Sequence, residues 1–289
     1  FEFAAHYTDD VQALADYAIE RHYPEIKDSP NKYRFFLAKV VTVQANLIAK
    51  WQQIGFVHGV MNTDNTTISG ETIDYGPCAF IDTYSLDAVF SSIDTNGRYA
   101  FGNQPNIAIW NVTRLAESLL PLLGDDHEEA VTIAKEELDK FAVQFYEQFF
   151  KGMLLKLGIT DRVDGDEELV KELLTLMEAS KADYTNTFRA LSEGRMLQWM
   201  EQDDAFLAWH TKWTTRLGEA GFSLDDEFGV MQSVNPAIIP RNYYVDEAIR
   251  YAELGNMTKF NTLLKALQSP FTVDEANAHL TTPPGDCGP

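Results

Sequence analysis

Apolar residues recur at helical spacing along most of the chain, and this periodicity predicts a mainly α-helical protein. The first expected helix begins at Asp9 and stops near Pro24, and the second spans residues 33–53. The second carries too many apolar residues for a surface helix, so we expect it to be central to the fold. Beyond Pro105, glycine residues divide the pattern into further expected helices at 106–122, 127–157, 166–179, 182–192, 200–218, 243–254 and 256–268.

The residues between the second helix and Pro105 do not show the helical pattern. From Phe56 to Asp82, short runs of β-forming residues alternate with glycines, which predicts a small β-hairpin that carries functional loops. Residues 83–105 are rich in turn-forming residues and are expected to be irregular. The predicted fold class is therefore mainly α with one small β-hairpin.

Composition and charge restrict the partners of the protein. The chain has 289 residues, of which 45% are hydrophobic and 23% charged, as is typical of globular proteins, and its 23 basic against 44 acidic side chains give a formal net charge of −21. No basic stripe is available to displace counterions from nucleic acid or to bind an anionic membrane, and no apolar run is long enough to span a bilayer. We therefore expect neither a nucleic-acid nor a membrane partner.

The two cysteines are too few for a disulfide framework or for a zinc site built from pairs of cysteines. Cys78 and Cys287 lie 209 positions apart in the sequence. A reducing compartment is therefore expected, which is the bacterial cytoplasm, or the mitochondrial matrix if the source is eukaryotic.

One short segment carries most of the candidate chemistry. It reads HGVMNTDN at residues 58–65 and is followed by IDYG at 73–76. Asn65 and Asp74 are nine positions apart across the expected hairpin, so their side chains can converge, and an amide oxygen with a carboxylate is a ligand pair suited to Mg²⁺ held mainly by substrate phosphates. Protein kinases hold their metal ions in a similar way, with an asparagine and the aspartate of an Asp-Phe-Gly motif.

The segment departs from the kinase pattern at the catalytic base. A kinase catalytic loop carries its aspartate five positions before the asparagine, where this chain has Val60, whereas Asp64 directly precedes Asn65. The chemistry is therefore not expected to be ordinary γ-phosphoryl transfer. The pattern alone leaves two interpretations open, a nucleotide–metal site and a plain acidic turn.

Several longer segments carry a family resemblance. Besides the two motifs above, the chain contains LADYAIERHYPE, GRYAFGNQP, IAIWNVTRLAESLLPLL and PAIIPRNYYVDEA. Over residues 1–270 it resembles the selenoprotein O family, whose members are kinase-fold protein adenylyltransferases. The resemblance implies a protein-kinase-like C-lobe over 1–122 and a helical C-terminal extension over 123–289. It also implies a metal-dependent enzyme, a nucleotidyltransferase that moves AMP from ATP to Ser, Thr or Tyr hydroxyls of protein substrates.

Site roles follow from this resemblance. Asp64 is expected to be the catalytic residue that accepts the proton of the acceptor hydroxyl. Asn65 and Asp74 are expected to hold Mg²⁺ or Mn²⁺, with Asp74 also binding near the phosphates of ATP. Transfer of UMP instead of AMP stays open, because base choice depends on the other lobe of the kinase fold. A rival from a different class also stays open, a catalytically silent, pseudokinase-like binding module that serves partner docking.

Parts of the family pattern are absent from the sequence. No Gly-rich phosphate loop and no ATP-contacting lysine can be located, and the chain opens at Phe1 rather than at methionine. The chain is therefore expected to be the C-terminal two-thirds of a family member and to be inactive on its own. Cys287 is the candidate for the family's C-terminal redox residue, a role that stays open because no basic neighbour activates its thiol.

Other polar residues have a structural interpretation beside the functional one. His58 is expected to be a buried histidine that orders the loop. Arg98, Asn103 and Gln104 either shape an activation-segment-like loop or an acceptor site, or serve loop hydrogen bonding. Arg241 either acts within the family motif or forms a structural ion pair.

Overall fold

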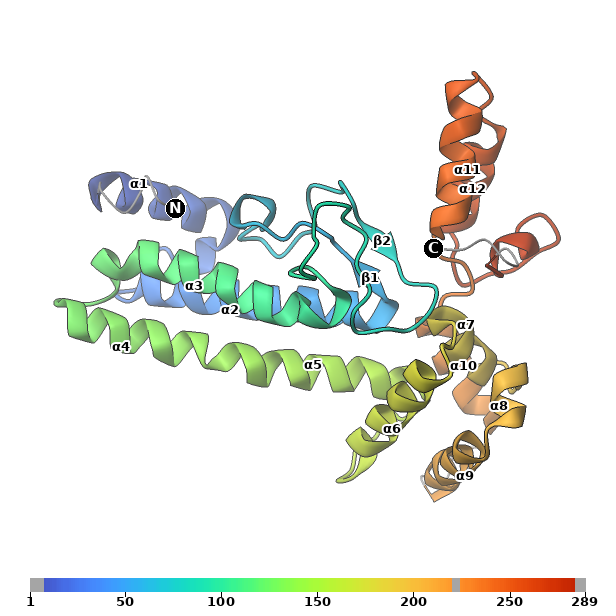
Figure 1. The fold of residues 1–289 in the computed structure, drawn as a ribbon. Helices are drawn as coiled ribbons and strands as arrows, with labels where there is room; N and C mark the ends of the chain where they lie inside the picture. The colour runs from blue at the N-terminus through green and yellow to red at the C-terminus, as the bar shows by residue number, and fades with distance from the viewer. Residues whose placement is uncertain (1–7, 220–223, 284–289) are drawn as a thin grey trace.

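Five helices build the first half of the protein, whose computed structural model describes residues 8–219 and 224–283, and the last two of them follow one another end to end (Figure 1). They are α1 (Thr8–His22), α2 (Lys32–Ile54), α3 (Gln104–Leu123), α4 (His127–Leu138) and α5 (Lys140–Lys156). Helix α2 contacts the other four and buries a broad stripe of its residues in the first apolar core. The prediction of a central second helix is therefore confirmed.

Shorter helices build the second half. They are α6 (Asp166–Ala179), α7 (Tyr184–Leu191), α8 (Gln198–Gln202), α9 (Asp204–Glu219), α10 (Leu224–Val234), α11 (Asn242–Glu253) and α12 (Thr258–Leu267). Helix α5 joins two apolar cores, because Phe141 and Phe145 lie in the first and Met153 and Leu154 in the second, with residues of α6 to α10. The α11–α12 pair packs on a small third cluster and projects away from the other helices (Figure 1).

Regular β-structure is limited, in the described residues, to one antiparallel pair and isolated bridges. Strand β1 (Phe56–Val57) pairs with β2 (Ala79–Phe80), and a bridge between Thr66 and Thr72 closes a hairpin inside the loop that joins the two strands. We call this connection the 58–78 loop. Short 3₁₀ helices are η2 (Pro24–Ile26), η3 (Thr63–Asn65), η4 (Phe101–Asn103) and η5 (Ala278–Leu280). The mainly α fold with a small β-hairpin is thereby confirmed.

Two predicted helices are each divided in the structure. The expected helix 127–157 consists of α4 and α5, and the expected helix 200–218 consists of α8 and α9 with a break at Asp203. Asp203 has an extended backbone, with φ −108° and ψ 105°, and its carboxylate accepts hydrogen bonds from the N–H groups of Ala205 (2.8 Å) and Phe206 (3.1 Å). This aspartate caps α9, a signal that apolar periodicity does not carry. Helix α10 is a further element that the periodicity did not predict.

The first core bears on the expected domain division, which the structure leaves open. Its cluster of buried residues continues past residue 122 into α4 and the first half of α5. The division into 1–122 and 123–289 therefore stays a prediction. In the two ranges that the structure describes, none of the helices combines the length and the apolar character that crossing a bilayer requires.

A buried arginine ties the C-terminal part of the chain to the rest. Arg241 is fully buried, and its guanidinium pairs with Asp82 and with Asp183 (Nη1 to Oδ2, 2.7 Å) and donates to the carbonyl of Thr281 (3.1 Å). Asp183 also caps α7 by accepting from the N–H of Asn186 (2.7 Å). Of the two interpretations of Arg241, the structure supports the structural ion pair, because the buried guanidinium is neutralised by two carboxylates of the chain itself.

A lysine is enclosed in the second half of the protein without a carboxylate partner among the described residues. Lys156, at the end of α5, is 3% exposed, and its Nζ lies 4.3 Å from the ring centroid of Phe188 and 5.5 Å from that of Tyr184. Burial lowers the pKa of Lys156 to about 7, because the charged ammonium loses its hydration. The unfolded chain keeps the ordinary lysine pKa, so it binds more protons than the folded chain between about pH 7 and pH 10.

We predict that this lysine makes the free energy of unfolding rise by about 2 kcal/mol between pH 7 and pH 9. The pKa of the folded state is depressed, so the destabilisation is fully present below about pH 7 and fades as the pH approaches the pKa of the unfolded state. Urea denaturation at both pH values should show that Lys156→Met removes this rise. Lys151→Met, which replaces an exposed lysine on the same helix, should retain it. The same pH dependence in both variants would contradict the prediction.

Candidate functional site

Two neighbouring amide side chains hold the start of the 58–78 loop and the segment that precedes α3. Gln104, in the first turn of α3, is fully buried; its Nε2 donates to the carbonyl of Phe56 (2.9 Å) and its Oε1 accepts from the N–H of His58 (2.9 Å). The Gln104 amide thus supplies the two backbone hydrogen bonds that a neighbouring strand would otherwise supply. Asn103 donates from Nδ2 to the carbonyl of Arg98 (2.6 Å). For Asn103 and Gln104 the structure therefore supports loop hydrogen bonding, one of the two interpretations left open by the sequence.

The middle of the loop is held by two further polar side chains. Asn111 of α3 is 3% exposed, and its Nδ2 donates to the carbonyl of Met61 (3.0 Å) and to the hydroxyl of Thr66 (2.9 Å). Tyr99 donates from its hydroxyl to Oδ1 of Asn62 (2.6 Å). These contacts fix the chain on both sides of η3, which carries the candidate catalytic residue.

The hairpin within the loop is held on its other side by α2. Gln44 donates from Nε2 to the carbonyl of Thr67 (2.6 Å), and Trp51 donates from Nε1 to the hydroxyl of Thr72 (3.0 Å). Since α2 is the central helix of the first core, the hairpin is anchored to the interior of the fold.

His58 joins the two arms of the loop. Its ring is 1% exposed and stacks on Trp51, with 5.4 Å between ring centroids and 22° between planes. Nδ1 accepts from the N–H of Val60 (3.4 Å) and Nε2 lies 2.8 Å from the carbonyl of Ile73, so these partners assign a neutral ring with the proton on Nε2. Ile73 directly precedes Asp74. The prediction of a buried histidine that orders the loop is therefore confirmed.

The predicted site residues lie at the open end of the hairpin. Asp64 and Asn65 belong to η3 and lie just before the isolated bridge, and Asp74 follows the bridge on the returning arm. Asn65 donates from Nδ2 to the carbonyl of Val60 (3.0 Å), which fixes its amide and leaves Oδ1 as the remaining acceptor. Asp64 and Asp74 are exposed, and neither carboxylate is paired with a cation of the described residues.

The backbone at Asp74 is held in an unusual conformation. Asp74 has φ +56°, in the left-handed region, which costs about 1 kcal/mol for a residue with a side chain. The N–H of Gly76 donates to the carbonyl of Asp74 (2.9 Å) and closes a tight turn at Tyr75, whose ring is 64% exposed. Such conformations persist only where the surrounding structure maintains them, and they cluster at functional sites.

Close approach between the two arms requires glycine at position 59. Gly59 has φ +83°, and a Cβ at this position would lie 2.9 Å from the carbonyl oxygen and 2.9 Å from Cγ of Pro77. Pro77 follows the turn that contains Asp74. Gly59 therefore allows the start of the loop to contact the arm that carries the second carboxylate.

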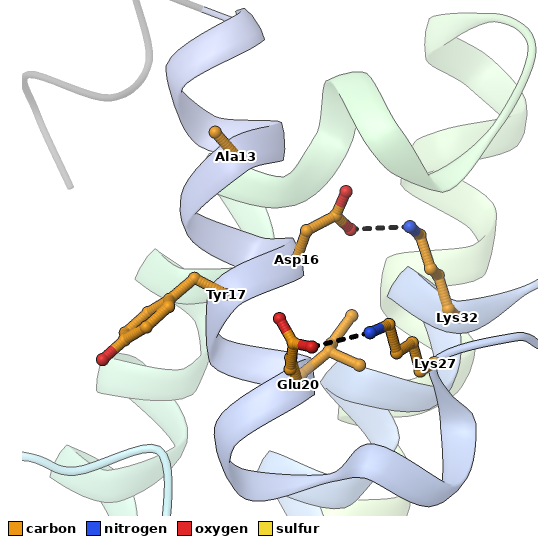
Figure 2. A pocket seen from close by; sticks show the side chains of 7 residues that line it. Ala13, Asp16, Tyr17, Glu20, Lys27 and Lys32 are labelled. Carbon is orange, nitrogen blue, oxygen red and sulfur yellow. Dashed lines mark hydrogen bonds and ion pairs between the residues drawn. The ribbon is translucent and has the colours of Figure 1, made fainter.

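A cavity of about 310 Å³ lies elsewhere, beside α1 (Figure 2). Figure 2 shows its two lysines facing carboxylates of α1: Lys32 pairs with Asp16 and Lys27 with Glu20, each at 2.7 Å. Since both cations are already paired, this cavity offers no free charge for an ionic ligand. The 58–78 loop therefore remains the stronger candidate site.

Comparison with known proteins assigns the family. A sequence model described as Protein adenylyltransferase SelO matches residues 2–268. The Protein nucleotidyltransferase YdiU of Geobacillus kaustophilus (strain HTA426) is 49% identical over 98% of this chain, and the proteins of the same name from Bacillus mycoides (strain KBAB4) and Bacillus cereus (strain AH187) are 50% identical over 96%. The chain belongs to the SelO family. The family resemblance predicted from the sequence motifs is confirmed.

The chain spans about three-fifths of the length of these SelO-family relatives. It covers 60% of the Geobacillus protein and 57% of each of the two Bacillus proteins. The names of the relatives refer to whole proteins. An activity of the whole protein is therefore a proposal for the chain described here.

The donor set at the hairpin end fits a magnesium or manganese ion that is held mostly by phosphate oxygens. Asn65 offers an amide oxygen and Asp74 a carboxylate, and both are hard donors. The described residues contain no group of three or more His, Cys, Asp or Glu side chains that could hold a metal ion. Two protein ligands, completed by phosphates and water, are typical of magnesium in ATP-dependent enzymes. The ligand roles of Asn65 and Asp74 stay predictions.

Sequence reasoning missed the residues that anchor the loop to α2 and α3, chiefly Gln44, Trp51 and Asn111. The sequence does contain a signal that marks the two amides, Gln44 and Asn111, as residues with a buried hydrogen-bonding role. Gln44 and Asn111 interrupt apolar stripes of their helices, and a buried amide in such a stripe has to find hydrogen-bond partners. The partners themselves come from the loop and cannot be read from helical periodicity. Cys287 lies outside the described residues, so its redox role stays a prediction.

We predict that Gly59→Ala lowers the free energy of unfolding by about 2–3 kcal/mol, because the added Cβ combines positive-φ strain with a forced shift of Pro77. Gly165→Ala is the matched control. Gly165 has φ +97° and no heavy atom within 4 Å of the added Cβ, so this variant should lose only the strain, about 1 kcal/mol. Chemical denaturation measures both losses. Equal losses would show that the contact with Pro77 is not a constraint on the loop.

Proposed function

We propose that the whole protein containing this chain is a metal-dependent protein adenylyltransferase that moves AMP from ATP to Ser, Thr or Tyr hydroxyls of other proteins. One observation supports the proposal: Asp64 and Asn65 lie just before the bridge that closes one anchored hairpin, and Asp74 lies just after it, in a member of the SelO family. In this proposal residues 1–122 correspond to a kinase-like C-lobe, and the bacterial cytoplasm is the location.

The proposed reaction needs a group that accepts one proton. The acceptor hydroxyl oxygen forms a bond to the α-phosphorus of ATP, the bond from that phosphorus to the oxygen bridging to the β-phosphate breaks, and pyrophosphate leaves. The hydroxyl proton goes to the carboxylate of Asp64, which is exposed and therefore accessible to a protein substrate. An exposed carboxylate that no lysine or arginine of the described residues neutralises suits this role.

Asn65 and Asp74 have a positioning role in this proposal. The metal ion, when bound, supplies positive charge that offsets the charge of the phosphates. Asn65 would hold it through Oδ1, since its Nδ2 is occupied by the carbonyl of Val60. Asp74 would hold it from the opposite arm, just before the tight turn that the Gly76 hydrogen bond closes. Transfer then depends on orientation and charge more than on covalent catalysis.

A second candidate is transfer of UMP. The relatives are named protein nucleotidyltransferases, which leaves the transferred nucleotide open, whereas the family description names adenylyl transfer. Base choice belongs to residues that contact the base, and neither a phosphate loop nor an ATP-contacting lysine can be located in this sequence. We therefore expect this chain alone to be inactive.

We predict that the whole protein transfers label to protein from ATP labelled at the α-phosphate but not from ATP labelled at the γ-phosphate. Asp64→Asn should lower the rate by about 10²–10⁴-fold, because the proton acceptor is lost. Asp74→Asn should lower it by at least about 10²-fold, because a charged ligand is lost. Asp10→Asn replaces an exposed aspartate on α1 and should leave the rate unchanged.

Three outcomes would count against parts of this proposal. Label from the γ-phosphate would indicate a kinase. Label from UTP in preference to ATP, identified by the mass of the modified protein, would indicate uridylyl transfer. No label from any nucleotide, with partner binding unaffected by Asp74→Asn, would favour the silent binding module.

A further inference from the structure

An exposed tryptophan next to the 58–78 loop lies between two arginines. The guanidinium carbon of Arg98 is 4.9 Å from the ring centroid of Trp110, and that of Arg114 is 5.3 Å from it. The Trp110 side chain is 41% exposed. We call these three residues the Arg98–Trp110–Arg114 patch. Tryptophan and arginine are the residue types most enriched where proteins bind one another.

Arg98 is unusual among the arginines of this acidic chain. With the exceptions of Arg21 and Arg98, every arginine forms an ion pair with a carboxylate of the described residues. Asp94 is close in sequence, but its two carboxylate oxygens accept from the backbone N–H groups of Arg98 (2.8 Å) and Tyr99 (2.7 Å). Among the described residues no carboxylate therefore pairs with the guanidinium of Arg98, which leaves it able to bind a carboxylate from another molecule.

Hydrogen bonds fix the backbone at Arg98. Besides the contact with Asp94, the carbonyl of Arg98 accepts from Nδ2 of Asn103 (2.6 Å). Stacking on Trp110 restrains the side chain itself. Binding at a group already held in place loses less conformational entropy than binding at a free surface arginine.

The patch adjoins the catalytic segment. Tyr99, the residue after Arg98, donates to Asn62, two positions before Asp64. Asn111, the residue after Trp110, donates to the carbonyl of Met61. The patch and the candidate proton acceptor are thus carried by the same hydrogen-bonded unit, which is where a protein substrate has to lie when its hydroxyl reaches Asp64.

We propose that the Arg98–Trp110–Arg114 patch docks the acceptor protein through a segment that carries carboxylates beside the accepting hydroxyl. This inference rests on the proposed transfer function. Arg98 supplies a cation that no carboxylate of the described residues pairs with, Arg114 a second one that Glu117 partly neutralises (2.5 Å), and Trp110 an apolar surface in contact with both. Acidic acceptor segments are the class of partner that this combination recognises.

The net charge of this chain gives the test a defined expectation for acidic and basic peptides. At −21, the chain as a whole repels acidic peptides and attracts basic ones. A preference for acidic peptides therefore has to come from a local feature. Loss of that feature should reverse the preference, not merely weaken it.

The test uses the whole protein and three peptides of equal length, each with one Tyr flanked by Glu, Gln or Lys. Anisotropy of fluorescent peptides, without ATP, measures binding. The Glu peptide should bind at least about tenfold more tightly than the Lys peptide. The double variant Arg98→Gln, Arg114→Gln should reverse this order, and Arg98→Lys should keep most of it because the charge remains.

Arg21→Gln is the matched control, since Arg21 is an exposed arginine on α1 that also lacks a carboxylate partner among the described residues. It should leave the preference for the Glu peptide unchanged. Thermal unfolding of each variant shows that the fold is retained. A preference for the Lys peptide in the unmodified protein, or a Glu preference that survives the double variant, overturns the proposal.

A separate measurement keeps this inference apart from the proposed function. Transfer of label from α-labelled ATP to the same peptides reports the reaction. Label on the peptides without a Glu preference would leave the function standing and overturn the docking proposal. A Glu preference that depends on the two arginines, with no label on any peptide, would support acidic-segment docking by a protein that lacks the transferase activity.

Discussion

The 58–78 loop depends on side chains for its hydrogen bonds, because its backbone forms almost no regular ladder. Two-residue strands at its ends and one isolated bridge satisfy few of its polar groups, and buried polar groups that stay unpaired are costly. Gln104, Asn111 and Gln44 supply the missing partners from α3 and α2. The candidate site is therefore as well positioned as the two helices behind it, although it is itself irregular.

His58 extends this constraint to the second arm. Its neutral ring is enclosed by Trp51 and bonds to the carbonyl of Ile73, so the position of Asp74 is coupled to the start of the loop through a single imidazole. Gly59 permits the same coupling by letting Pro77 approach. A substitution at either position would displace the arm with Asp74 relative to η3, and metal binding and proton transfer both depend on that relative position.

Helical periodicity was enough to predict most helices, the central place of α2 and the irregular loop, because these follow from which residues avoid water. It failed at Asp203, where a cap divides a helix without changing the apolar pattern. Asn65 and Asp74 were proposed as metal ligands from their spacing, since metal and phosphate chemistry restricts residue types, and Asp64 was proposed from the family resemblance; all three roles stay predictions. The supporting contacts were not predicted, because Gln44 meets Thr67 and Asn111 meets Met61 only after the loop has folded onto the helices.

The two proposals assign opposite charges to neighbouring parts of one surface. Asp64 and Asp74 leave the hairpin end acidic, which suits a cation carrying phosphates and disfavours any carboxylate of the acceptor. Arg98 and Arg114 lie beside it and bind carboxylates away from the phosphates. The carboxylates of an acidic acceptor would thus bind at the Arg98–Trp110–Arg114 patch, while only its neutral hydroxyl approaches the acidic end of the hairpin. On a chain with a net charge of −21, this separation would give a role to an arginine that pairs with no carboxylate of the described residues and lies next to the loop.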